Sequence, residues 1–205
     1  MSLLTNWGYT LTTLDMLSDL ITPTEFNTYT GNKYAGDTRI AGAIAAASQG
    51  IRDRVGWHLY PTATCKLETV GLDKRITKTL YGLQIQLPAR YVTAVSRVSI
   101  DGIELTNFSL ETSGILRVYN AGCRLNSAIV IEYTAGLPEG LLSTIKDIAA
   151  ARAVKPLAQS YGVNSESAGG VSISYNSAWA QDTSASLLQA AEAAALEPYS
   201  LRGLF

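Results

Sequence analysis

Two alanine-rich stretches with helical periodicity enclose a long segment whose apolar residues alternate with polar ones. In the first stretch, residues 37–55, apolar residues recur at steps of three or four and so share one helix face. The second stretch starts at Pro138, directly after a strand and a glycine turn, and ends near Lys155. From residue 62 to 134 the period changes to two, which is typical of strands. This order predicts an α+β fold, in which a helical bundle is interrupted by an antiparallel β-rich insert.

Local signals predict two shorter helices, which bring the bundle to about four helices. Thr22, Pro23 and Glu25 form a capping box with proline at the first helical position, and they predict a helix over residues 23–30. The last helix is predicted over residues 184–196, where leucine and alanine recur at helical spacing and a proline follows. These helices would flank the two long ones.

Three further signals concern the ends and turns of the elements. Asp37 is predicted to cap the first long helix, and Pro156 is predicted to kink or locally break the second. Asp101-Gly102 is a two-residue hairpin signal between two strand-like runs. The insert should therefore contain about six or seven short strands, arranged as a small sandwich or barrel-like sheet.

The sequence suggests a division into four parts. Residues 1–21 are predicted to be an N-terminal arm or a short helix. Residues 22–61 and 135–197 are predicted to form the helical core, and residues 62–134 the β-rich insert. Residues 198–205 follow the last helix as a C-terminal tail. We therefore expect one helical core made from two separated segments of chain.

Charge and cysteine content exclude several classes of protein. The formal net charge is −1, which gives no global electrostatic case for binding nucleic acid or a membrane surface. No apolar run approaches the length of a membrane span, and no signal peptide is recognised. Cys65 and Cys123 lack the spacing of a zinc site and are expected to be small buried side chains in a reducing compartment. No metal and no cofactor is predicted.

No catalytic motif is present, and we expect that the chain is not an enzyme. The sequence contains no phosphate-binding loop, no dinucleotide fingerprint and no nucleophile elbow. His58 is the single histidine, so a hydrolase with histidine-based chemistry would have to use it. A structural role at the end of a helix is the simpler interpretation of His58, and the hydrolase remains the remote alternative.

A carbohydrate-binding β module is a second remote alternative. Such a module should expose aromatic side chains on one face of its sheet. The aromatic residues of the insert are instead scattered along the sequence, and they are more simply core or turn residues: Tyr81, Tyr91, Phe108, Tyr119 and Tyr133.

A basic group made of Lys74, Arg75 and Lys78 lies in a predicted hairpin of the insert. It is either a solvated loop or a tip that faces phosphates. Contact with DNA through so few charges would be effective only if many copies lined a channel, because non-specific binding needs several charges acting together.

Four segments, taken in order, resemble the head-to-tail connector proteins of tailed bacteriophages, which are also called adaptor or head-completion proteins. Asp37–His58 resembles the first core helix with its aromatic exit, and Leu87–Gly102 resembles a strand and an Asp-Gly hairpin. Tyr133–Pro138 resembles the turn into the second core helix. Leu196–Arg202 resembles the common ending of the family, a proline-tyrosine pair and a basic residue after a helix.

The resemblance implies a structural virion protein at the interface between head and tail, made in the cytoplasm of the bacterial host. It implies a ring of twelve copies beneath the portal protein, with genome DNA passing through the centre without sequence-specific binding. The ring would extend the DNA channel and offer a platform for the next neck or tail-completion protein. A long β insert could contact a tail or neck partner that smaller relatives lack. A tail-terminator or other neck protein is the nearest alternative.

The C-terminal tail carries several apolar residues after a proline that stops the helix. Two interpretations stay open. The tail folds back on its own domain, or it docks onto the portal or a neighbouring subunit, with aromatic anchors and an arginine as a polar contact. The candidate docking residues are Pro198, Tyr199, Leu201, Arg202, Leu204 and Phe205.

Overall fold

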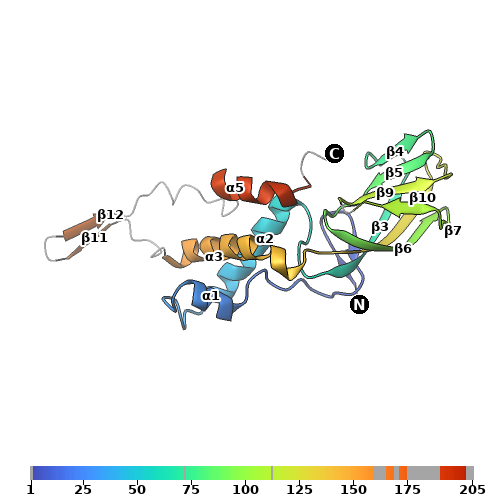
Figure 1. Cartoon of the computed structure of the whole chain (residues 1–205). Helices are drawn as coiled ribbons and strands as arrows, with labels where there is room; N and C mark the ends of the chain where they lie inside the picture. Colours follow the sequence, from blue (N-terminus) through green and yellow to red (C-terminus); the bar gives the residue numbers. More distant parts are fainter. Residues whose placement is uncertain are drawn as a thin grey trace. The chain divides into compact units, whose positions relative to one another are not determined.

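The computed structural model describes residues 2–71, 73–111, 113–158, 165–168, 171–174 and 190–201. The chain divides into two compact units. The first, which we call the β unit, consists of residues 1–18, 52–143 and 197–205, and the second, the helical unit, consists of residues 19–51 and 144–196. Within the described ranges, four α-helices and two antiparallel sheets of six and four strands confirm the α+β fold class (Figure 1).

The larger sheet of the β unit has six antiparallel strands. In spatial order they are β1 (Leu3–Leu4), β2 (Thr10–Leu11), β3 (Ala63–Val70), β10 (Ala128–Ala135), β6 (Val92–Ile100) and β7 (Ile103–Glu104). β10 lies at its centre and pairs with β3 along its whole length, from Ala128 opposite Val70 to Ala135 opposite Ala63. The predicted Asp101-Gly102 hairpin is confirmed between β6 and β7, with positive φ angles of 52° and 81°.

The smaller sheet of the β unit has four antiparallel strands. They are β4 (Ile76–Thr79), β5 (Gly82–Gln86), β9 (Ile115–Tyr119) and β8 (Phe108–Leu110), in that spatial order. Alternate residues of β5 and β9 are buried, among them Leu83, Ile85, Leu116 and Val118. The larger sheet likewise buries one face, which includes Leu67, Ile129 and Ile131. Each sheet thus has one core face and one open face, as in a two-layer sandwich.

The N-terminal residues 1–21, expected as an arm or a short helix, contribute two short strands to the larger sheet. β2 pairs with β3, so that Leu11 lies opposite Cys65, and the Thr12 amide donates to the Thr64 carbonyl at 2.8 Å. No helix forms among the described residues of this stretch before α1. Leu11 is fully buried, so this side chain fixes the ribbon to the core of the β unit.

The helical unit contains α1 (Pro23–Tyr29), most of α2 (Ile40–Val55), nearly all of α3 (Ser143–Ala158), and α5 (Ala190–Leu196). The capping box of α1 is confirmed, because Thr22 and Glu25 exchange both of its hydrogen bonds. Glu25 also pairs with Lys146 of α3 at 2.6 Å, and this partner, together with the cap, lowers the pKa of Glu25 to about 2. The capping residue thus also links α1 to α3.

The helix boundaries differ from the predicted ones at three places. α2 begins at Ile40, because the Asp37 carboxylate is bonded to the Arg39 amide and side chain outside the helix. Pro138 precedes a short 3-10 helix, η1 (Glu139–Leu141), and α3 starts only at Ser143. α3 continues through Pro156 to Ala158, so the predicted break does not occur. Residues 184–189 of the predicted last helix lie outside the described residues.

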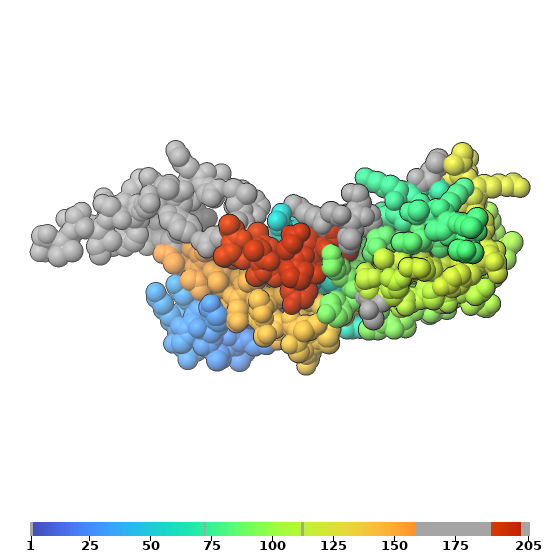
Figure 2. All heavy atoms as spheres, turned by 45° about the horizontal axis from the view of Figure 1, so that its top comes forward, coloured from blue at the N-terminus to red at the C-terminus, as the bar shows by residue number. Residues whose placement is uncertain are grey.

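A half-buried carboxylate joins α5 to α3 in the helical unit. Glu192 lies 3.2 Å from the Lys155 ammonium and 3.7 Å from the Arg152 guanidinium. Burial lowers the pKa of Arg152, and the nearby Glu192 opposes this shift. A β-carbon added to Gly50 of α2 would lie 3.3 Å from the Arg152 guanidinium, so glycine gives that group room. Figure 2 shows α5 (red) lying directly beside α3 (orange).

Residues 165–168 and 171–174 form a separate two-stranded ladder, β11 (Ser165–Ala168) and β12 (Val171–Ser174). The two strands pair antiparallel, from Ser165 opposite Ser174 to Ala168 opposite Val171.

Candidate docking surfaces

The segment of the C-terminus up to Leu201 is part of the β unit. The Trp57 indole nitrogen donates to the Tyr199 carbonyl at 2.7 Å, and the Arg90 Nε donates to the Ser200 carbonyl at 2.9 Å. The Leu201 amide donates to the Val55 carbonyl at 2.8 Å, and its side chain is 4% exposed. Three bonds from three different parts of the chain therefore fix residues 199–201.

The six candidate docking residues differ in their surroundings. Leu201 is buried in its own unit and has no surface to offer a partner. Pro198 is exposed and Tyr199 is half-buried within a short 3-10 helix, η2 (Glu197–Tyr199). The remaining three lie outside the described residues: Arg202, Leu204 and Phe205.

The exit from α2 is held by a buried arginine. Gly56 ends the helix with a φ of 84°, a conformation that suits glycine. Arg52 then donates to the carbonyls of His58, Tyr60 and Ser18 at 2.9, 3.0 and 2.6 Å. These bonds fix the backbone around Trp57, which is fully buried and makes an edge-to-face contact with His58.

His58 is a structural residue of the core. Its Nδ1 lies 2.8 Å from the Tyr9 hydroxyl and its Nε2 lies 3.1 Å from the Ala135 carbonyl. A neutral ring with the proton on Nε2 satisfies both contacts. Burial lowers the pKa of His58 to about 4, although the bond to Ala135 opposes this. Burial also raises the pKa of the Cys65 thiol to about 12, so neither group is suited to nucleophilic chemistry.

We expect stability to fall by about 3 kcal/mol as the pH is lowered from 6.5 to 4, the ordinary and the folded pKa of His58. In this window the unfolded chain binds a proton at His58 and the folded chain does not. Urea unfolding at several pH values between about 7 and 4.5 measures the slope of stability against pH, because ordinary carboxyl groups titrate mostly below this range. His58→Gln keeps an N–H for Ala135 and cannot titrate, so its profile should be much shallower than that of the wild type. An equal slope in both proteins would contradict the assignment.

The basic group predicted from the sequence is not a single patch. Arg75 binds Asp73 at 3.3 Å and its guanidinium lies close to Gly8, where an added β-carbon would be 3.1 Å away. Burial alone would raise the pKa of Asp73, but bonds from Thr69 and Arg75 lower it. Lys74 and Lys78 are exposed. Arg75 is thus a structural residue, and only the two lysines lie exposed at the surface.

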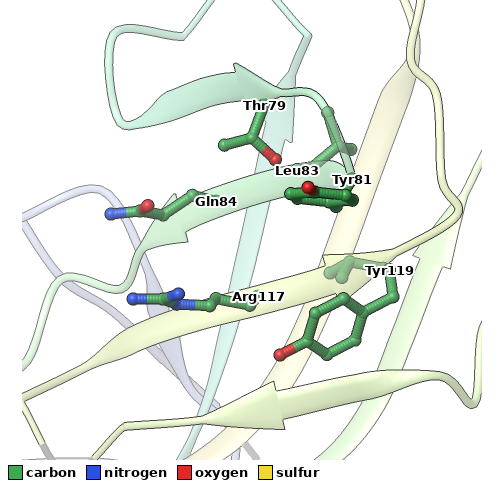
Figure 3. A pocket seen from close by; sticks show the side chains of 7 residues that line it. Thr79, Tyr81, Leu83, Gln84, Arg117 and Tyr119 are labelled. Atoms are coloured by element: carbon green, nitrogen blue, oxygen red, sulfur yellow. The ribbon is translucent and has the colours of Figure 1, made fainter.

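A surface that the sequence did not reveal lies on the open face of the smaller sheet. Tyr81 and Tyr119, which were expected to be scattered core or turn residues, both line one shallow depression, together with Gln84 and Arg117 (Figure 3). Tyr81 is 73% exposed and Tyr119 is 39% exposed, whereas Tyr133 is fully buried. The signal that could have indicated this site is the pair Leu80-Tyr81 at a two-residue turn, where glycine or asparagine would be usual.

A family model of head completion proteins matches residues 19–183, which is well over half of the chain. The chain belongs to the head completion protein family. The resemblance inferred from the motifs is thereby confirmed. A head completion protein has a structural role in the phage virion, at the neck between head and tail. No curated protein matches the chain.

The family match covers α1, α2, α3 and strands β3 to β12, but not the whole β unit. The β1–β2 ribbon before residue 19 and the anchored segment 197–201 both lie outside it. The described residues hold no cluster of three or more histidine, cysteine or acidic side chains that could hold a metal ion. No helix within the described ranges is long and apolar enough to cross a membrane.

Proposed function

We propose that this head completion protein forms a ring of twelve copies beneath the portal, extends the DNA channel and carries the next neck or tail-completion protein. The family match over residues 19–183 is the observation that carries the proposal. A closed ring needs heterologous interfaces, in which one face of a subunit meets a different face of its neighbour. Genome DNA would pass through the ring without sequence-specific contacts, consistent with a net charge of −1.

Imaging of the purified protein mixed with portal complexes tests the ring. We expect a coaxial ring stacked on the portal, with a symmetry that gives the copy number. A protein that ignores the portal and binds the end of tail tubes would contradict the proposal and favour the nearest alternative, a tail terminator.

We further propose that the end of the C-terminal tail docks onto the portal. Residues 199–201 are hydrogen-bonded to Trp57, Arg90 and Val55. The proposed docking segment, which begins at Arg202, would therefore start from a fixed point. Leu204 and Phe205 would act as apolar anchors, with Arg202 as the polar contact.

Removal of residues 202–205 is expected to leave thermal unfolding unchanged and to abolish co-sedimentation with portal complexes. Removal of residues 199–205 should in addition lower the unfolding temperature, because it takes away the three anchoring bonds. Full-length protein with Glu197→Ala, a change at an exposed position outside the six candidate docking residues, is the control. Retained attachment of the shorter truncation would contradict the docking role.

A further inference from the structure

Three exposed apolar side chains gather at one end of the smaller sheet, and we call them the hairpin surface: Leu80, Tyr81 and Tyr119. Leu80 and Tyr81 form the β4–β5 turn and are 90% and 73% exposed. Gly82 pairs with Tyr119 at the end of β9, and the Asn120 amide donates to the Tyr81 carbonyl at 2.9 Å. The turn is therefore bonded to the end of β9, which holds these side chains together.

Polar side chains with fixed positions border the hairpin surface. Gln84 and Arg117 extend side by side from neighbouring strands (Figure 3). Arg117 pairs with Glu111 at 2.7 Å, and the Tyr119 hydroxyl lies 2.9 Å from the Ser109 hydroxyl. These contacts order the surface before any partner arrives, which reduces the entropy lost on binding.

The composition of the hairpin surface is that of a protein contact. Tyrosine and arginine are the residues most often found at the energetic centre of protein interfaces, together with large apolar anchors. Turn chemistry offers no reason for Leu80 and Tyr81, because two-residue hairpin turns favour asparagine, aspartate and glycine. Contact with DNA phosphates would not need an exposed leucine either.

Charge complementarity indicates the chemistry of the partner. Residues 73–86 and 105–119, which contain the four strands and their turns, hold four basic and two acidic residues, although the whole chain has a net charge of −1. Both acids, Asp73 and Glu111, are already paired with arginines. Lys74 and Lys78 have no carboxylate partner among the described residues. The uncompensated charge is positive, so it favours an acidic partner and opposes a symmetric contact between two copies.

The geometry of β4 favours contact through side chains. β4 is an edge strand of four residues that carries an exposed lysine near the turn. Short edge strands with lysine resist the addition of a further strand. A partner is therefore expected to receive the turn and the tyrosines in pockets.

We propose that the hairpin surface docks onto an acidic protein on the tail side of the neck. Leu80 and Tyr81 enter apolar sockets of that protein, Tyr119 flanks them, and Lys78 faces its carboxylates. The inference rests on the proposed function. It assigns the tail-side contact to a part of the β unit that is distinct from the C-terminal docking segment.

The test compares the full-length protein with Leu80→Ser/Tyr81→Ser and with Lys78→Glu. Purified tails measure direct binding of each protein. DNA-filled heads come from an infection that makes neither tails nor the native protein; each protein is supplied in its place, and its incorporation into the heads is measured. The control is Leu4→Ser/Met16→Ser, which removes two apolar side chains of similar exposure, 78% and 77%, elsewhere in the β unit. Equal thermal unfolding of all four proteins shows that each is folded.

We expect Leu80→Ser/Tyr81→Ser and Lys78→Glu to assemble onto heads as the wild type does. Leu80→Ser/Tyr81→Ser should bind tails about tenfold or more weakly than the wild type. Lys78→Glu should weaken binding most at low salt, and the control should stay within about twofold. The inference would be overturned if Leu80→Ser/Tyr81→Ser bound tails as tightly as the wild type, or if the wild type did not bind tails. Loss of the variants from heads would also overturn the inference, because it assigns the surface to the ring or portal. Absence of the wild type from heads would instead contradict the proposed function, with tail binding still deciding the role of the hairpin surface.

Discussion

Replacement of Trp57 with alanine is expected to lower the free energy of unfolding by about 3–5 kcal/mol, the range for a buried tryptophan. The indole is fully buried, packs edge-to-face against His58 at 5.6 Å, and holds the Tyr199 carbonyl through Nε1. Its loss opens a cavity and also frees the segment that precedes the proposed docking residues. Urea unfolding followed by far-ultraviolet circular dichroism gives the free energy without depending on tryptophan fluorescence.

Trp57→Phe is the matched control for the cavity. It keeps an aromatic ring and loses the hydrogen bond to Tyr199, so we expect a smaller loss of about 1–2 kcal/mol. Portal attachment should fall with Trp57→Ala even below the temperature at which the β unit unfolds. A loss of less than about 1 kcal/mol for the alanine variant would mean that the C-terminal segment does not depend on this anchor.

Replacement of Gly136 with alanine is expected to cost about 3 kcal/mol or more, because steric overlap and backbone strain add. Gly136 has a φ of 153°, and an added β-carbon would lie 2.4 Å from the Thr62 α-carbon and 2.8 Å from its nitrogen. These are backbone atoms, so no side chain can move aside. The Gly136 amide also donates to the Tyr91 carbonyl at 3.0 Å, which ties the turn to the residue directly before β6.

Gly140→Ala is the control for this prediction, since an added β-carbon there meets nothing within 4 Å. It lies in the same connection between β10 and α3, within η1, and should change stability by less than about 1 kcal/mol. Thermal unfolding of both variants by calorimetry provides the comparison. Similar unfolding temperatures would show that the approach of Thr62 to residue 136 does not constrain the fold.

Features set by neighbouring residues were predictable from the sequence. The capping box at Thr22 depends on residues three positions apart, and the Asp101-Gly102 turn on two adjacent ones. The stripe of α2 has many apolar positions, so its period is unambiguous. The break expected at Pro156 did not occur, because a proline two residues before the end of α3 removes only one helical hydrogen bond.

Features set by distant residues were not predictable in this way. β1 and β2 have two residues each, too few to show a period, and β2 is defined by pairing with β3 some fifty positions later. The pairing of Arg75 with Asp73 and the exposure of Tyr81 beside Tyr119 likewise depend on how the strands pair. The sequence identified the basic group and the family, but it could not show that Arg75 is paired with Asp73 while Lys78 is exposed.

Both chain ends belong to the β unit, and the backbone passes between the two units four times, after residues 18, 51, 143 and 196. One of these passages occurs within α2, which is continuous from Ile40 to Val55. Tension applied to one unit is therefore shared among four covalent connections, whereas two domains joined by a single linker would depend on one. No single cut between the units would break the covalent link between them, and this suits a structural protein of the neck.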